Sequence, residues 1–226
     1  MISFKGAQFS KEVILFAVFF YVRYTVSYRD LQEILGERGV QVDHSTLNRW
    51  VVKYSPQIAA KARRRKAPTG RSWRMDETYI RVKGAWIYLY RAVDKFGKTL
   101  DFMLLKRRNK PAATKFFARA LEVKGMPCKI VIDRSGANTA GINAINRMLK
   151  SFGRPIPIEM VRIKYLNNMI EQDHRMIKKR VRPMLGFKSF PSASATLEGI
   201  EVANMIRKGQ MTPGLCPFAQ FAALAA

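Results

Sequence analysis

The order of strand-like and helix-like segments between residues 72 and 185 is the feature that most limits the fold. Three strand-like segments come first, at residues 72–80, 85–93 and 99–106. Helices and strands then alternate: a helix at 110–123, a strand at 129–132, a helix at 137–151, a short strand at 155–160 and a long helix at 168–185. Three sequential strands followed by alternation predict a mixed sheet with helices on its faces. This β-β-β-α-β-α-β-α order is that of an RNase H-like α/β fold.

The first 60 residues predict a small all-α domain in front of this sheet. Ser27 and Asp30 form a capping-box pattern at the start of the segment 28–35, and Gly36 offers a stop directly after it. Asp43 then precedes a second amphipathic stretch, which we expect Pro56 to end soon after residue 54. The helix-like segments span residues 9–24, 28–35 and 44–54. Two short helices joined by a glycine-containing turn indicate a helix-turn-helix, a motif that places its second helix in the major groove of DNA.

A run of basic residues separates these two parts of the chain. Like charges in a row repel, and Pro and Gly punctuate the end of the run, so residues 61–71 are predicted to form a solvated linker. We also expect Arg63, Arg64 and Arg65 in this run to contact phosphate. The predicted organisation is therefore a helical DNA-binding domain at 1–60, the linker, a catalytic domain at 72–208 and a C-terminal tail at 209–226.

The charge of the chain indicates a polyanionic partner. Lys and Arg number 41 against 16 Asp and Glu, which gives a net charge of +25. Nucleic acid is the usual partner of such a field. An anionic membrane is the rival, but the longest apolar run, 13–22, is too short to span a bilayer and no secretory signal is visible. Cys128 and Cys216 lack the spacing of a zinc site and are expected to be reduced, which favours a cytoplasmic, nucleoid-associated protein without membrane partners.

Three acids in the most structured segments need an explanation in so basic a chain, and a divalent metal is the best one. Asp76 lies in the first strand, Asp133 closes the fourth, and Glu171 lies on the long helix. Carboxylates are the ligands that Mg²⁺ or Mn²⁺ takes, and two such ions about 4 Å apart can activate an attacking oxygen and stabilise a leaving one. Because strand side chains alternate, we expect at most one of Asp76 and Glu77 to face such a site.

Polar and basic residues at helical spacing are predicted to contact DNA. In the second helix of the helix-turn-helix, Ser45, Asn48 and Arg49 lie away from the apolar face and are candidates for base contacts. On the long helix, a stripe of cations continues from Glu171. Its members are Arg175, Lys178 and Arg182, which we expect to hold phosphates.

Several of these segments together resemble the insertion-sequence transposases of the IS6 family, relatives of the DDE transposases and retroviral integrases. The resemblance covers most of the chain and is carried by residues 4–6, 27–31, 73–79, 90–94, 131–133 and 167–175. It implies a catalytic triad of Asp76, Asp133 and Glu171 that binds magnesium. It also implies cleavage of double-stranded DNA at the element's terminal inverted repeats and strand transfer into target DNA. Because two element ends must be held together, we expect a homo-oligomer.

Each acid also has a simpler interpretation. Asp76 could be a strand acid paired with Arg74, and Asp133 could initiate a turn before Ser135, a position that Asp favours. Glu171 could pair with Arg175 one helical turn later. The remaining acids are expected to lie at the surface or in salt bridges, and they are Glu77, Asp94, Asp101, Glu159 and Asp173. Asp173, being close to Glu171, is the most plausible auxiliary, and His174 could aid proton transfer, hold DNA or simply be packed.

The sequence therefore favours a DNA transposase of an insertion sequence. The first alternative is a non-catalytic or decayed relative that binds DNA without chemistry, although acids are intact at all three triad positions. A second alternative is a nuclease of RNA–DNA hybrids, which shares the fold and the metals. The helix-turn-helix disfavours it, because recognition of duplex ends is a requirement of transposases.

Overall fold

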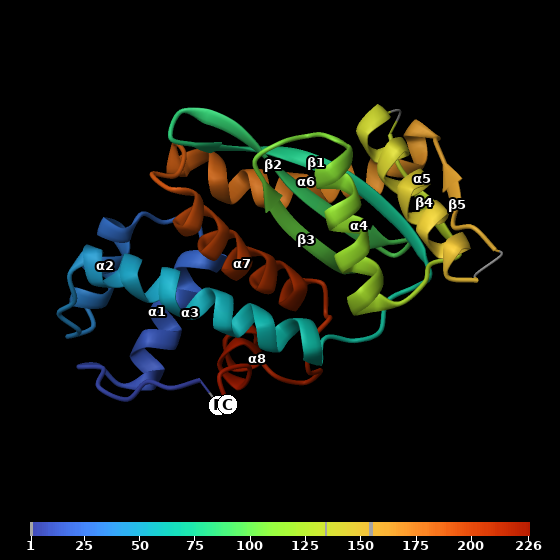
Figure 1. Ribbon diagram of the computed structural model, residues 1–226. Coiled ribbons are helices and arrows are strands. Elements are labelled where there is room, and N and C mark those ends of the chain that lie inside the picture. The colour runs from blue at the N-terminus through green and yellow to red at the C-terminus, as the bar shows by residue number, and fades with distance from the viewer. Residues whose placement is uncertain (1, 134, 154–155) are drawn as a thin grey trace. The chain divides into compact units, whose positions relative to one another are not determined.

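The computed structural model describes residues 2–133, 135–153 and 156–226. The chain divides into two compact units, which are treated separately below. The sheet unit comprises residues 68–175, and the helical unit comprises the residues up to 67 together with 176–226. Figure 1 shows the elements of both units.

The sheet unit has a five-stranded mixed sheet in the order β3-β2-β1-β4-β5. β1 (Ser72–Val82), β2 (Ala85–Asp94) and β3 (Thr99–Leu105) form an antiparallel meander, whereas β4 (Lys129–Val131) and β5 (Glu159–Val161) run parallel to β1. Its helices are α4 (Lys110–Lys124), α5 (Gly136–Ser151), the 3₁₀ turn η1 (Lys164–Asn167) and α6 (Asn168–Val181), which continues into the helical unit. The predicted RNase H-like element order is confirmed. The strand expected at 155–160 is shorter, and residue 155 lies outside the described residues.

Two tight turns set the register of the antiparallel strands. Lys83 and Gly84 both have positive φ, as a two-residue type I′ hairpin requires, and they join β1 to β2. At the next turn the Asp94 carboxylate accepts hydrogen bonds from the backbone N–H groups of Phe96 and Lys98, at 2.9 and 3.0 Å. Asp94 is fully buried, so it is not the surface acid that one of the two predicted alternatives made it. Its role is to satisfy the backbone donors of the turn.

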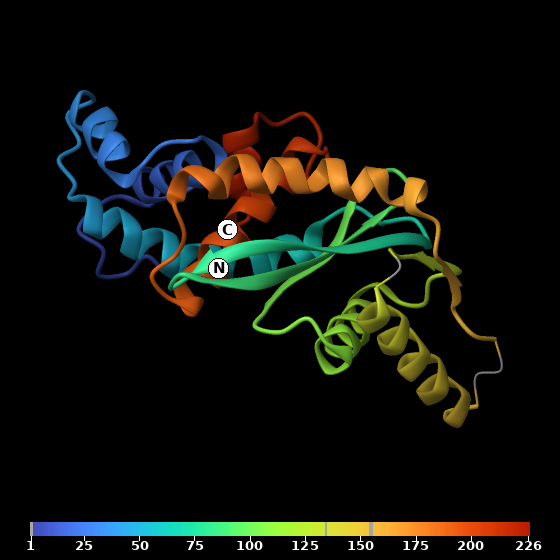
Figure 2. The ribbon, with the colours of Figure 1, turned by 90° about the horizontal axis from the view of Figure 1, so that it is seen from above.

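Helices α4 and α5 cover one face of the sheet, as Figure 2 shows. Trp73 and Met75, two residues apart on β1, both point to this face, where they pack with Phe116 of α4 and Ile142 of α5. The first turns of α6 lie against the other face, where the Asn167 side chain donates to the Met75 carbonyl at 3.4 Å. Within β1, Trp73 and Met75 therefore face α4 and α5, and Asp76 faces α6, where it contacts His174.

The helical unit begins with three helices close to those predicted. They are α1 (Lys11–Arg23), α2 (Tyr28–Gly36) and α3 (His44–Arg65). The capping box is present: Ser27 Oγ accepts from the Asp30 backbone at 3.1 Å, and the Asp30 carboxylate accepts from the Ser27 backbone at 2.8 Å. Asp43 caps α3 by accepting from Ser45 N at 2.8 Å. These local bonds fix where α2 and α3, the two helices of the predicted helix-turn-helix, begin.

Helix α3 is longer than predicted, with Pro56 inside it. Proline removes one helical hydrogen bond. Beyond it, however, Ile58, Ala59 and Ala62 are buried and continue the apolar face of the helix. This burial, much of it against α7, outweighs the lost bond. The segment predicted as the start of a basic linker is therefore the last turn of a helix, and the boundary between the two units falls after residue 67 of the chain.

A helix that the sequence analysis did not predict, α7 (Phe190–Arg207), runs through the centre of the helical unit. It is buried on almost every side, so it lacks the one-sided apolar pattern of a surface helix. Residues 176–207 consequently pack with the N-terminal helices, whereas the prediction put them in the catalytic domain. The tail forms α8 (Pro217–Ala223), and Ile2 N donates to Ala225 O at 3.1 Å, which brings the two ends together in Figure 2.

Candidate active site

Three carboxylates meet at one edge of the sheet. Asp76 and Glu77 lie on β1, Asp133 follows β4, and one oxygen from each lies within 4.8 Å of the others. The parallel register explains the meeting, because Arg74 pairs with Val131 and Asp76 and Asp133 lie two residues further along their segments. The sequence thus places two distant acids side by side through strand pairing.

The expectation that only one of Asp76 and Glu77 can face the site is wrong. Asp76 does point toward α6 and Glu77 toward α5, as strand alternation requires. Pairing between β1 and β4 ends at Arg74, however, and leaves the edge of β1 open next to Asp133. Both side chains can therefore reach Asp133 from the two faces of the strand.

Glu77 is held in a buried polar setting that the sequence analysis missed. Its side chain is 2% exposed, and its Oε2 accepts from Asn138 Nδ2 at 3.3 Å and forms an ion pair with Arg108 Nη2 at 3.4 Å. Burial raises the pKa of the Glu77 carboxyl, although Arg108 acts in the opposite direction. The predicted salt bridge exists, but Glu77 is not a surface acid. Arg108 and Asn138 lie 31 and 61 residues from Glu77, and no sequence pattern joins them to it.

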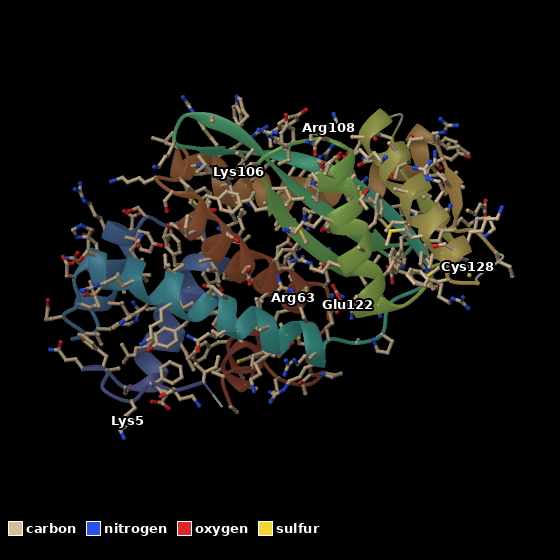
Figure 3. The ribbon with its side chains drawn as sticks, in the orientation of Figure 1. Lys5, Arg63, Lys106, Arg108, Glu122 and Cys128 are labelled. Atoms are coloured by element: carbon tan, nitrogen blue, oxygen red, sulfur yellow. The ribbon has the colours of Figure 1, made fainter. Side chains whose placement is uncertain are left out.

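Asp133 combines a local role with a role in the cluster. Its Oδ1 accepts from Ser135 N at 3.0 Å, so the turn-initiating interpretation is confirmed. Its Oδ2 lies 3.1 Å from Arg108 Nη2. Arg108 therefore bridges Asp133 and Glu77. Figure 3 shows Arg108 at the end of the sheet where α4 begins.

A series of polar contacts between buried side chains connects Asp76 to His174 of α6, Arg91 of β2 and Asp173 of α6. His174 Nε2 lies 3.2 Å from Asp76 Oδ2, Arg91 Nη1 lies 3.3 Å from His174 Nδ1, and Arg91 Nη2 is 2.6 Å from Asp173 Oδ2. Because arginine is always a donor, Nδ1 must accept and Nε2 must carry the proton. Burial lowers the pKa of His174, which favours this neutral imidazole. The expected partner of Asp76, Arg74, instead donates to Ser72.

Glu171 is exposed in the first turn of α6. Among the described residues, the group of three acids whose oxygens lie within 4.8 Å of one another is Asp76, Glu77 and Asp133, and Glu171 is not part of it. His174 lies three residues later on the same helix and contacts Asp76. Three residues after Glu171 were predicted to contact phosphate. Arg175 and Arg182 are exposed, and Lys178 is half-buried.

The helical unit contains a groove of about 1070 Å³, and Ser45, Asn48 and Arg49 line it. Asn48 is hydrogen-bonded to Tyr28, and Arg49 Nη2 donates to Thr46 Oγ1 at 2.8 Å. Arg180 and Lys188 add positive charge to the same groove. The three residues predicted to contact bases therefore lie on one concave surface of this unit.

The three arginines expected in the linker lie in the last turn of α3. Arg63 pairs with Glu198 at 3.4 Å, and Arg65 donates to the Ala223 carbonyl at 2.8 Å. Arg64 is exposed. Two of the three thus have partners inside the helical unit. None of the helices in the described ranges combines the length and the apolar character needed to cross a membrane.

Comparison with known proteins gives consistent relatives. A family model described as a DDE domain matches residues 70–210. The chain is 44% identical over 205 residues to the transposase for insertion sequence-like element IS431mec of Staphylococcus aureus strain Mu50, covering 91% of this chain and 88% of the relative. It is 43% identical over the same shares to the transposase for insertion sequence element IS257 in transposon Tn4003, also from Staphylococcus aureus.

Solved structures of retroviral integrases are also similar. The HTLV-2 integrase catalytic core domain in complex with magnesium, in its dimeric form, aligns with a TM-score of 0.47 and 17% identity, over 70% of this chain and 99% of the other. The catalytic core domain of BIV integrase aligns with a TM-score of 0.45 and 16% identity, over 68% and 95%.

Proposed function

Since the chain belongs to the IS6 family of DDE transposases, we propose that it binds the terminal inverted repeats of its insertion sequence, cuts the DNA at the element's ends and joins them to target DNA. The observation that carries the chemistry is the meeting of Asp76 and Asp133 at the sheet edge of the matched domain. As two ends must be held at once, the protein acts as a homo-oligomer. Its DNA substrates place it in the cytoplasm, at the nucleoid.

Asp76, Asp133 and Glu171 are the residues that would hold the metal ions. The donor set fits, since carboxylate oxygens are what Mg²⁺ and Mn²⁺ take. One oxygen of neighbouring Glu77 is buried and makes no hydrogen bond of normal length among the described residues, which leaves it able to accept a cation. When bound, a pair of Mg²⁺ ions activates the attacking oxygen and stabilises the leaving oxygen of a phosphodiester.

The position of Glu171 supports its place in the triad. Residues three apart are neighbours on a helix surface, about 5–6 Å between their Cβ atoms. Glu171 lies about one helical turn before His174, and His174 contacts the Asp76 carboxylate. Its exposure leaves it free to turn toward a metal ion and a DNA strand. Arg175, Lys178 and Arg182 continue from it and would hold the phosphates.

The groove of the helical unit is the surface we assign to the terminal repeats. Ser45, Asn48 and Arg49 would read base edges in the major groove. Arg64, exposed at the end of α3, would contact phosphate, and Arg63 and Arg65 would do so by exchanging their internal partners. Phosphate contacts position the protein, whereas the contacts of α3 select the sequence.

Transposition of a supercoiled donor plasmid carrying the element's ends tests this function. The variants Asp76→Asn, Asp133→Asn and Glu171→Gln keep side-chain size but remove a charged ligand, and each is expected to abolish strand transfer while DNA binding persists. Glu122→Gln makes the same change at an exposed position of α4 and serves as the control. Full activity in all three variants would exclude the metal triad. Binding without cleavage by the unmodified protein would favour the non-catalytic alternative.

A further inference from the structure

We propose that Glu77 is an additional metal ligand, so that a divalent cation binds between Asp76, Glu77 and Asp133, with Asn138 positioning the carboxylates and Arg108 holding them together when the cation is away. This inference rests on the proposed function and extends its metal site beyond the triad. Glu77, which the sequence predicted to be a surface or salt-bridge acid, would thus take part in metal binding.

The spacing of the three oxygens suits one cation. They lie within 4.8 Å of one another. Ligands on opposite sides of a Mg²⁺ ion are about 4.2 Å apart, because each bond is about 2.1 Å long. Only one pair among three ligands can lie on opposite sides, and adjacent ligands are about 3.0 Å apart, so closing the cluster onto the ion needs side-chain movements of up to about 1 Å.

Glu77 has an oxygen available for such an ion. Its Oε2 is engaged by Asn138 and Arg108, whereas its Oε1 is buried and makes no hydrogen bond of normal length among the described residues; the hydroxyl of Tyr90, which pairs with Glu77 across β1 and β2, interacts with the same carboxylate. A buried carboxylate oxygen without a hydrogen bond of normal length is unusual, because burial removes the water that would otherwise bind it. The side chain is 2% exposed, so solvent does not satisfy that atom directly. The neutral Tyr90 hydroxyl does not offset the charge of three neighbouring carboxylates, whereas a cation would.

Asn138 is placed to orient the cluster. It is fully buried near the start of α5, and its Nδ2 reaches both Glu77 Oε2 at 3.3 Å and Asp133 Oδ1 at 3.5 Å. One amide group therefore bridges acids from β1 and from the segment after β4. The amide therefore fixes the orientation of the Glu77 carboxylate relative to Asp133.

Arg108 supplies the charge that a metal ion would otherwise provide. Its guanidinium lies 3.4 Å from Glu77 Oε2 and 3.1 Å from Asp133 Oδ2. It offsets one of the three negative charges, and a divalent cation offsets two. The Arg108 side chain is 32% exposed and lies just before α4, so it can swing out without disturbing the core. The entering cation and Arg108 should therefore compete for the same carboxylates.

Binding of Mn²⁺ to the intact, DNA-free protein, followed by electron paramagnetic resonance of the free ion and by calorimetry, tests the proposal. Glu77→Gln should weaken Mn²⁺ binding at least tenfold, as loss of groups around a metal typically does. Arg108→Gln should strengthen it, because the competing cation is gone. Glu122→Gln, an exposed acid at the far end of α4 in Figure 3, should leave it unchanged.

The outcomes separate this inference from the proposed function. If Asp76→Asn and Asp133→Asn lose Mn²⁺ binding and strand transfer but Glu77→Gln binds Mn²⁺ like the control, Glu77 is not a ligand and the transposase function stands. If neither Asp76→Asn nor Asp133→Asn changes either property, the proposed function fails as well. Should Glu77→Gln not fold, as judged by its thermal unfolding, Glu77→Asp decides, because it keeps the charge and withdraws the oxygens by one methylene: Mn²⁺ binding like that of the control overturns the proposal, and weaker binding supports it.

Discussion

The imidazole of His174 donates its Nε2 proton to Asp76 Oδ2 across 3.2 Å, because Arg91 occupies the other ring nitrogen. The contact orients the carboxylate on β1 from the side of α6. Asp173 completes the arrangement by pairing with Arg91 at 2.6 Å. Of the roles the sequence suggested for His174, a packed histidine agrees with these contacts, and the structure adds that it positions Asp76. Asp173 is buried with Arg91, which agrees with an auxiliary role in a salt bridge and not with a surface acid.

The tautomer of His174 is the first prediction. Nitrogen-15 NMR of the imidazole rings should show His174 neutral near pH 7 with its proton on Nε2. The chain has two histidines, so His44→Gln assigns the spectrum. In Arg91→Met, which removes the donor to Nδ1, the signal should shift toward a mixture of tautomers. A proton on Nδ1 in the unmodified protein would contradict the arrangement.

Breaking the Arg91–Asp173 pair should be costly. The two side chains are 1% and 6% exposed, so removing one leaves the other charged and buried. We expect Asp173→Asn to lower the free energy of unfolding by about 3–5 kcal/mol. Chemical denaturation measures this, with Glu122→Gln expected to stay within about 0.5 kcal/mol of the unmodified protein. An equally small effect for Asp173→Asn would show that the pair is not needed for stability.

The close approach of α7 to α3 depends on Gly199. A Cβ atom there would lie 2.6 Å from Ser55 Oγ and 2.7 Å from a methyl carbon of Val22. Gly199→Ala should therefore destabilise the protein by about 1–3 kcal/mol through overpacking. Gly36→Ala is the matched control, because the nearest atom to its Cβ would be 3.9 Å away. Similar thermal midpoints for the two variants would mean that the helices separate without cost.

Asp43, the N-cap of α3, should make the stability of the protein depend on pH in the acid range. Hydrogen bonds from the Ser45 hydroxyl and backbone N–H lower the pKa of the Asp43 carboxyl below its usual value of about 3.9. The folded state binds this proton less readily than the unfolded state, so the stabilisation is complete above about pH 4 and is lost as the pH falls through the lower, folded-state pKa. The difference in thermal midpoint between the unmodified protein and Asp43→Asn should thus shrink below about pH 4. Glu37→Gln, at an exposed acid, provides the reference.

Contacts to phosphate and to bases should separate by their salt dependence. Arg182→Gln removes an exposed cation and should weaken binding to all DNA sequences, lowering the salt slope by about one. Asn48→Ala should weaken binding to the terminal repeat selectively and leave the slope unchanged. Fluorescence anisotropy with repeat and scrambled duplexes at several salt concentrations distinguishes them. Equal losses on both duplexes for Asn48→Ala would remove it from sequence recognition.

Local patterns in the chain were sufficient to predict much of the fold. The alternation of strands, the capping box at Ser27 and the cap at Asp43 depend on interactions within a few residues, so they can be recognised without tertiary information. Helix α7 could not be recognised in this way, because a helix buried on all sides has no apolar stripe. The continuation of α3 past Pro56 likewise depends on a partner helix that is distant in sequence.

By itself, the sequence determined Asp76, Asp133 and Glu171 as candidate ligands, the order of the strands and the excess of positive charge that favours a polyanionic partner such as DNA. Tertiary structure alone decided that Glu77, Arg108 and Asn138 join Asp76 and Asp133, and that Arg91 and His174 stand behind Asp76. The physical reason is that these contacts cross between strands and helices, where distance along the chain says nothing about distance in space. An open strand edge then let two neighbouring side chains reach one site.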